Sequence, residues 1–158
     1  MQAKSKDQLI GDLIARYRAA TNRDVAFDKL AAARLGVSVT DLHCLNIVEA
    51  RHGITAGELA VESGLTTGAV TAVIDRLERV GFARRVRDER DRRKVKVEVT
   101  QTFYDRAREI WGPVAAEWQQ AIGDRFTVDE LRTIAAFLTE VDELGARHAE
   151  RVRALTDG

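Results

Sequence analysis

The spacing of apolar residues along the first third of the chain has a helical period. Residues 5–20 carry apolar side chains three and four positions apart, which predicts an amphipathic helix. A second helical piece is predicted from residues 21–22 to a stop at Gly36. Thr40 is the expected N-cap of the next helix, which should close at Gly53. The chain up to this point is therefore predicted to be helical.

Two short helices joined by a tight turn are predicted next. Residues 55–58 read Thr-Ala-Gly-Glu, the pattern in which a Thr and a Glu side chain cap a helix start reciprocally. Gly64 can adopt the positive φ that the turn requires, and Thr66 should start a second helix that ends at Gly81. The pair is expected to bury Leu59, Leu65, Val70 and Val73. This pattern is typical of a helix-turn-helix.

The apolar period then changes from 3.6 to 2. Residues 82–87 and 95–99 predict two strands, and residues 95–99 alternate apolar and polar side chains strictly. The connecting residues contain no glycine for a two-residue turn, so the loop should be longer and project. The three valines of the second strand should face the core, and Lys96 and Glu98 should face water. A helix-turn-helix followed by two strands and an arginine-rich loop predicts a winged helix.

Two long helices complete the chain. One is expected from Thr100 to about residue 122, kinked at Pro113, and the other opens with a second capping pattern at residues 127–130. The last helix carries Leu131, Ile134, Leu138 and Val141 at alternating spacings of three and four, and Val152 and Leu155 continue the same register. We predict a mainly α (α+β) fold with helical regions at 1–39 and 101–158 around a winged helix-turn-helix domain at 40–100.

The distribution of charge points to a partner that the total would exclude. The 158 residues contain 25 Lys and Arg against 25 Asp and Glu, so the formal net charge is zero. Residues 84–96 nevertheless hold eight bases and three acids, a local charge of +5. A phosphate backbone responds to the field of such a patch rather than to the total. One face of a neutral protein is thus predicted to meet nucleic acid.

The predicted DNA contacts lie on the outer face of the second short helix and in the loop. Small residues near the start of that helix let it enter a major groove, where threonines can read base edges. Arginines of the loop can enter the neighbouring minor groove, where the potential is most negative. The predicted contact residues are Thr66, Thr67, Gly68, Thr71 and Ala72 on the helix, Arg76 and Arg79 toward phosphates or bases, and Arg90, Arg92, Arg93 and Lys94, supported by Lys96, in the loop.

Acidic residues near these arginines are expected to hold them in shape. Asp91 is close enough in sequence to pair with Arg93, and Asp75 could pair with an arginine of the wing. The alternatives to DNA binding are that the two short helices are an ordinary surface helix pair and that the basic loop is a solvated run of charge.

Residues 55–100 resemble the MarR family of bacterial transcriptional regulators. The resemblance rests on VIDRLERVGFARR and on RDERDRRKVKVEVT, which is similar to the family's wing signature of Asp-x-x-Asp-Arg-Arg before an alternating strand. Glu89 stands where members of the family often have Pro. The resemblance implies a homodimer on a pseudo-palindromic operator, with the helix from Thr66 in the major groove and Arg93 in the minor groove. Many members are repressors released by a small, often phenolic, ligand or by cysteine oxidation.

Apolar stripes near both ends of the chain support dimerisation independently. Residues 40–100 are expected to close their own core, so the stripes of the terminal helices are best buried against a second copy. A two-fold dimer would present two recognition helices about 34 Å apart, one turn of DNA. The alternatives are a monomeric bundle and a winged-helix module that binds protein without sequence-specific DNA binding.

Other features carry weaker expectations. A small-molecule effector pocket could include Tyr17, His43, Trp111 and Trp118, although aromatic residues at helical spacing are usually core. Cys44, the only cysteine, lies on an apolar stripe and is expected to be a core residue, with its redox activity left open.

Several classes of protein are not expected. The histidines share no metal-ligand spacing, and the chain has neither a phosphate loop nor a catalytic triad pattern, so we expect no metal, no cofactor and no enzyme. Without a span of about 20 apolar residues or a signal-peptide pattern, we expect a cytoplasmic protein with no membrane partner.

Overall fold

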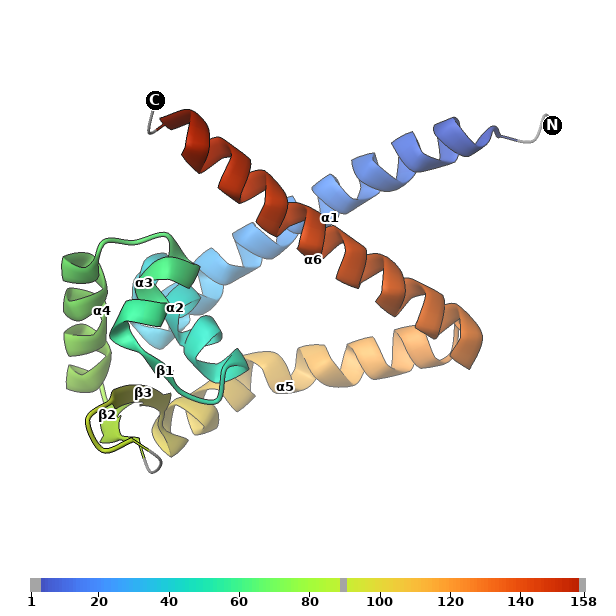
Figure 1. The fold of residues 1–158 in the computed structure, drawn as a ribbon. Coiled ribbons are helices and arrows are strands. Elements are labelled where there is room, and N and C mark those ends of the chain that lie inside the picture. The colour runs from blue at the N-terminus through green and yellow to red at the C-terminus, as the bar shows by residue number, and fades with distance from the viewer. Residues whose placement is uncertain (1–3, 89–90, 157–158) are drawn as a thin grey trace. The chain divides into compact units, whose positions relative to one another are not determined.

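A computed structural model describes residues 4–88 and 91–156 of the chain (Figure 1). The chain divides into two compact units, Met1–Trp111 and Gly112–Gly158. In chain order the elements are α1 (Lys6–Leu35), α2 (Val39–Ala50), β1 (Ile54–Thr55), α3 (Ala56–Ser63), α4 (Thr67–Arg79), β2 (Ala83–Arg87), β3 (Val95–Val99), α5 (Gln101–Gly123) and α6 (Val128–Thr156). The predicted mainly α winged-helix fold is confirmed. Within the described ranges, no helix is both long enough and apolar enough to cross a bilayer.

Helix α1 is one continuous helix, so the predicted division near residue 21 is wrong. Ser5 caps its start reciprocally with Gln8, and Gly36 ends it at φ 74°. Thr21, expected to help open a second helix, donates its hydroxyl to the backbone oxygen of Tyr17 at 2.9 Å. A threonine inside a helix can satisfy its hydroxyl on the preceding turn, and it then leaves the helix unbroken.

Helix α2 begins at Ser38 rather than at the predicted Thr40. Ser38 Oγ accepts from the Asp41 backbone N–H at 3.0 Å, and Asp41 Oδ2 accepts from the Ser38 N–H at 3.2 Å. Because Ser38 and Asp41 satisfy each other's backbone N–H groups, the helix starts at Val39 and Thr40 lies inside its first turn. The helix ends at Ala50, and His52 and Gly53, both at positive φ, turn the chain into β1.

The helix-turn-helix forms as predicted from its caps. Thr55 Oγ1 accepts from the Glu58 N–H at 3.3 Å, and Glu58 Oε2 accepts from the Thr55 N–H at 2.9 Å. Gly64 lies in the left-handed region at φ 69°, and Thr66 Oγ1 caps α4 by accepting from the Ala69 N–H at 3.2 Å. These local bonds set where α3 ends and α4 begins.

The wing is a three-stranded antiparallel sheet in the order β1-β3-β2. Strand β1, which was not predicted, pairs Ile54 with Val97, and β2 pairs Arg85 with the same residue from the other side. Val97 is buried as expected, whereas Val95 is 47% exposed, so the prediction that all three valines face the core is wrong. Val95 begins the strand at the outer end of the wing, beyond the reach of the core.

The hydrophobic core of the first unit includes parts of both flanking helices. Helix α1 contributes its last turns, and α5 contributes Phe103, which meets Phe82 edge-on with ring centroids 5.7 Å apart. Residues 40–100 therefore do not close the core alone, contrary to our expectation. The buried members are Ala31, Ala32, Leu35, Leu42, Cys44, Leu45, Val48, Ile54, Leu59, Ala60, Val70, Val73, Ile74, Leu77, Phe82, Ala83, Val97 and Phe103.

The second unit contains the rest of α5 and all of α6. Helix α5 continues through Pro113 to Gly123. Thr127 and Glu130 form the second predicted capping box, with the Thr127 N–H donating to Glu130 Oε2 at 2.8 Å. Apolar side chains of α6 remain open to solvent, among them Leu138 at 52% and Val152 at 61% exposure.

Candidate nucleic-acid interface

Helix α4 has one buried face and one exposed face. Val70, Val73, Ile74 and Leu77 are buried and hold the helix to the core. The predicted contact residues of this segment are all exposed: Thr66, Thr67, Gly68, Thr71, Ala72, Arg76 and Arg79. The sequence pattern therefore oriented the helix correctly.

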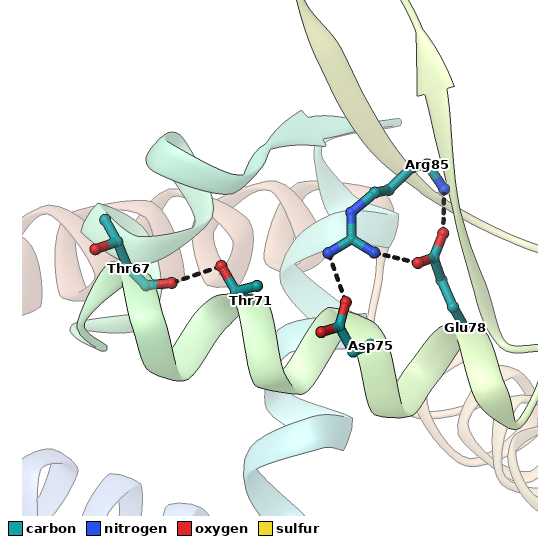
Figure 2. Close-up of polar contacts among 5 residues, drawn as sticks. All are labelled: Thr67, Thr71, Asp75, Glu78 and Arg85. Carbon is teal, nitrogen blue, oxygen red and sulfur yellow. Dashed lines mark hydrogen bonds and ion pairs between the residues drawn. The ribbon is translucent and has the colours of Figure 1, made fainter.

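The exposed face of α4 is slim near its start. A Cβ atom added at Gly68 would meet no atom within 4 Å, so this position is open space. Thr71, one turn later, donates its hydroxyl to the Thr67 backbone oxygen at 2.9 Å (Figure 2). Small residues spaced three and four apart lie on one side of a helix. This side can approach a groove closely because no long side chain projects from it.

Arg76 is bound to a buried carboxylate that the sequence did not single out. Its Nη2 donates to Asp41 Oδ1 at 2.6 Å and its Nε to Asp41 Oδ2 at 3.3 Å. Burial raises the pKa of the Asp41 carboxyl, but hydrogen bonds from Arg76 and Ser38 outweigh it and the pKa lies below its usual value. The Arg76 side chain is 45% exposed, so part of the guanidinium still faces solvent. Arg76 therefore joins α4 to the start of α2.

The wing is tied to α4 by one arginine between two carboxylates (Figure 2). Arg85 Nη2 donates to Asp75 Oδ1 at 2.8 Å, and its Nη1 pairs with Glu78. Its backbone N–H also donates to Glu78 Oε1 at 2.8 Å. The predicted pairing of Asp75 with a wing arginine is confirmed, and the partner is Arg85 of β2. Glu78 was not predicted as a partner. Because it lies three residues after Asp75, on the same side of the helix, the spacing could have indicated that both carboxylates bind one arginine.

The tip of the wing is a turn that presents two arginines. The Lys94 N–H donates to the Asp91 backbone oxygen at 2.8 Å, which places Arg92 and Arg93 at the two central positions. Asp91 Oδ1 accepts from the Arg93 N–H at 3.1 Å, so the predicted Asp91–Arg93 association is confirmed. Arg92 and Lys94 are exposed, and the Arg93 side chain is 96% exposed. Arg90, also predicted to contact DNA, lies outside the described residues.

Several acidic side chains of the described part of this surface are paired with cations of the protein. Besides the carboxylates bound to Arg85 and Arg76, Asp88 pairs with Lys96 at 2.5 Å and Glu98 with Arg84 at 3.1 Å. The cations at the wing tip and Arg79 are exposed to solvent. The acidic side chains that are paired elsewhere do not neutralise them. The arrangement favours an anionic partner such as a phosphate backbone.

The residues suggested for an effector pocket lie on α1, α2 and α5. Tyr17 is 42% exposed on α1 and His43 is exposed on α2. Trp111 packs edge-on against Phe27, with ring centroids 6.1 Å apart, and Trp118 belongs to the second unit and is 63% exposed.

Cys44 is a core residue. Its side chain is fully buried within the core that Leu45 also forms, and burial raises the pKa of its thiol. This environment suits packing and disfavours the thiolate that a redox sensor needs.

These features define a class of protein, the DNA-binding winged helix-turn-helix regulators. They are the slim exposed helix α4, the tight turn before it and the cationic wing. Residues 37–95 match the MarR family. The chain is also 31% identical, over 149 residues that cover 94% of it and 96% of the relative, to the uncharacterized HTH-type transcriptional regulator YcgE of Bacillus subtilis (strain 168). The chain belongs to the MarR family and is a transcriptional regulator.

Solved structures share the fold at lower sequence identity. The multiple antibiotic-resistance repressor MarR from Listeria monocytogenes 4b F2365 aligns with a TM-score of 0.57 at 17% identity, covering 90% of this chain and 99% of that one. Streptococcus pneumoniae FabT, in complex with DNA, aligns with a TM-score of 0.59 at 20% identity, covering 86% of this chain and 97% of FabT.

Proposed function

We propose that this regulator acts as a homodimer that binds a pseudo-palindromic operator through α4 and the wing. The observation that carries the proposal is the sorting of charge around α4. Carboxylates such as Asp75 and Asp88 are neutralised within the protein, while Arg92 and Arg93 are exposed at the wing tip. FabT, which has the same fold, is found in complex with DNA.

In the proposed complex, α4 lies in the major groove. Thr67, Gly68, Thr71 and Ala72 face base edges, and Thr66 lies at the helix start, where backbone N–H groups favour a phosphate. Arg79 contacts the phosphate backbone, as does the guanidinium edge of Arg76 that is not bound to Asp41. Arg90, Arg92 and Arg93 enter the minor groove, with Lys94 and Lys96 nearby.

The terminal helices form the proposed dimer interface. On α1, Leu9, Leu13, Ile14 and Tyr17 are each between 42% and 54% exposed, an apolar stripe of the kind that a partner covers. The exposed apolar residues of α6 provide a second stripe. Light scattering should report a dimer at micromolar concentration, and Leu13→Glu with Ile14→Glu should shift it toward monomer. A wild-type monomer at this concentration would contradict the dimer.

We propose repression as the direction of regulation, relieved by a small aromatic ligand. A dimer on an operator blocks the access of other proteins to that DNA, and the protein from Listeria monocytogenes with this fold is a repressor. Tyr17, His43, Trp111 and Trp118 remain the proposed ligand contacts. Thermal-shift screening with small aromatic acids tests for the ligand. Because the proposed partner is DNA, we also propose that the protein acts in the cytoplasm.

Selection of duplexes from a random library by the purified protein tests DNA binding. Affinity for the selected duplex is then measured by fluorescence anisotropy. Arg93→Ala should weaken binding by about 1–3 kcal/mol and flatten its salt dependence. Arg132→Ala, which removes an exposed arginine paired with Asp129 on α6, is the matched control and should change little. A protein that selects no duplex at low salt would instead support the protein-binding module.

A further inference from the structure

Thr71 uses its one hydroxyl hydrogen within helix α4. It lies in the second turn of α4, and its Oγ1 donates to the Thr67 backbone oxygen at 2.9 Å (Figure 2). A hydroxyl group has one hydrogen, so Thr71 can only accept from a base while this bond is kept. Its remaining contacts for a base edge are an Oγ1 lone pair and the Cγ2 methyl group.

The neighbouring positions do not supply the missing donor. The first two turns of α4 contain no Arg, Lys, Asn or Gln, the residues that bind purines through paired hydrogen bonds. Arg76, one turn further, is bound to Asp41 at 2.6 Å. Thr66 caps the helix start, where a phosphate is the favoured partner, and the Thr67 hydroxyl lies one turn ahead of the position that Thr71 occupies. Ala72 adds a second methyl group beside Thr71.

The C5-methyl group of thymine is the feature of a base edge in the major groove that matches these two side-chain methyl groups. In the major groove a G·C pair presents two acceptors on guanine and one donor on cytosine, with no methyl group. An A·T pair also presents one donor, on adenine N6, and two acceptors, adenine N7 and thymine O4, and it adds the thymine C5-methyl group, so the methyl group is what distinguishes it from G·C for these side chains. We infer, resting on the proposed function, that Thr71 and Ala72 select an A·T pair in each half-site by contact with the thymine methyl group.

Uracil substitution isolates this contact because deoxyuridine lacks only the C5-methyl group of thymine. The probe is the duplex that the wild-type protein selects from a random library, prepared once with thymine and once with deoxyuridine. Each contacted methyl should contribute about fourfold in affinity, so a dimer on two half-sites should bind the uracil duplex about 15-fold more weakly.

Three variants assign the discrimination to the side chain. Thr71→Ser removes the methyl and keeps the hydroxyl, so the ratio of the two affinities should fall toward one. Thr71→Val keeps a methyl and removes the hydroxyl, so the ratio should be retained. Thr139→Ser is the matched control, because Thr139 is also exposed and donates to a carbonyl one turn back, Ala135 O at 3.1 Å, on α6. Its ratio should equal that of the wild type.

The outcomes separate this inference from the proposed function. Equal affinity of the wild type for the thymine and uracil duplexes overturns it, as does full discrimination by Thr71→Ser. A selected sequence without thymine in the major-groove positions also overturns it. Failure to select any duplex overturns the proposed function itself, before uracil is introduced.

Discussion

Replacing Arg76 by alanine removes the main partner of a buried charge. Asp41 is 3% exposed and accepts two hydrogen bonds from Arg76, at 2.6 and 3.3 Å, and one from the Ser38 N–H at 3.2 Å. Breaking a buried ion pair from one side typically costs about 3–5 kcal/mol. The Arg76 side chain is 45% exposed, so water can replace part of what is lost, and we discount the loss to about 2 kcal/mol.

Urea unfolding of Arg76→Ala, Asp41→Ala and the double variant measures this pair. The free energy of unfolding should fall by about 2 kcal/mol in Arg76→Ala, and the double variant should cost less than the sum of the single changes. Arg34→Ala is the control, because its partner Glu109 lies 3.8 Å away and both side chains are exposed, so the loss should be about 0.5 kcal/mol or less. If Arg76→Ala costs no more than Arg34→Ala, or the two sites are additive, the Asp41–Arg76 pair does not stabilise the position of α4.

Three further changes test other parts of the surface. Gly68→Ala should raise the free energy of unfolding by up to about 1 kcal/mol, because the added Cβ meets open space in a helix. It should also weaken binding of the selected duplex, and tighter binding would contradict a close approach of DNA to α4 at Gly68. Arg85→Ala should weaken DNA binding about tenfold, because it detaches the wing from α4 and leaves Asp75 and Glu78 unpaired. Arg84→Ala, on the other side of the strand, is the control and should weaken binding less. A larger loss of affinity in Arg84→Ala than in Arg85→Ala would refute the role of Arg85. Because the pKa of Asp41 is lower in the folded protein, its contribution to stability is present above about pH 4, the ordinary aspartate range, and is lost as the pH falls through the folded-state pKa. Between pH 5 and pH 3, the free energy of unfolding in urea should therefore fall less in Asp41→Asn than in the wild type. An equal fall in both proteins would contradict this role of Asp41.

Features that depend on neighbours a few residues away were predictable. The capping box at Thr55, the left-handed Gly64 and the exposed face of α4 all follow from hydrogen bonds or periodicity within one or two helical turns. The two wrongly predicted helix starts also depend on neighbours within about one helical turn. Thr21 and Thr40 had plausible capping positions, but a carbonyl one turn back satisfied the first, and the Ser38 capping box set the start of α2 ahead of the second.

From the sequence alone, the order of elements, the cationic wing and the slim recognition helix could be inferred, because each is encoded by residue types at short spacing. The partners of the charges were decided only by tertiary structure. Asp41 and Arg76 lie 35 positions apart, and nothing near either residue in the sequence indicates that a buried carboxylate would meet the recognition helix. The same holds for β1, which is two residues long and becomes a strand only because β3 lies beside it. Side-chain periodicity has a range of a few residues, whereas an ion pair or a strand pairing depends on which elements the packed core brings together.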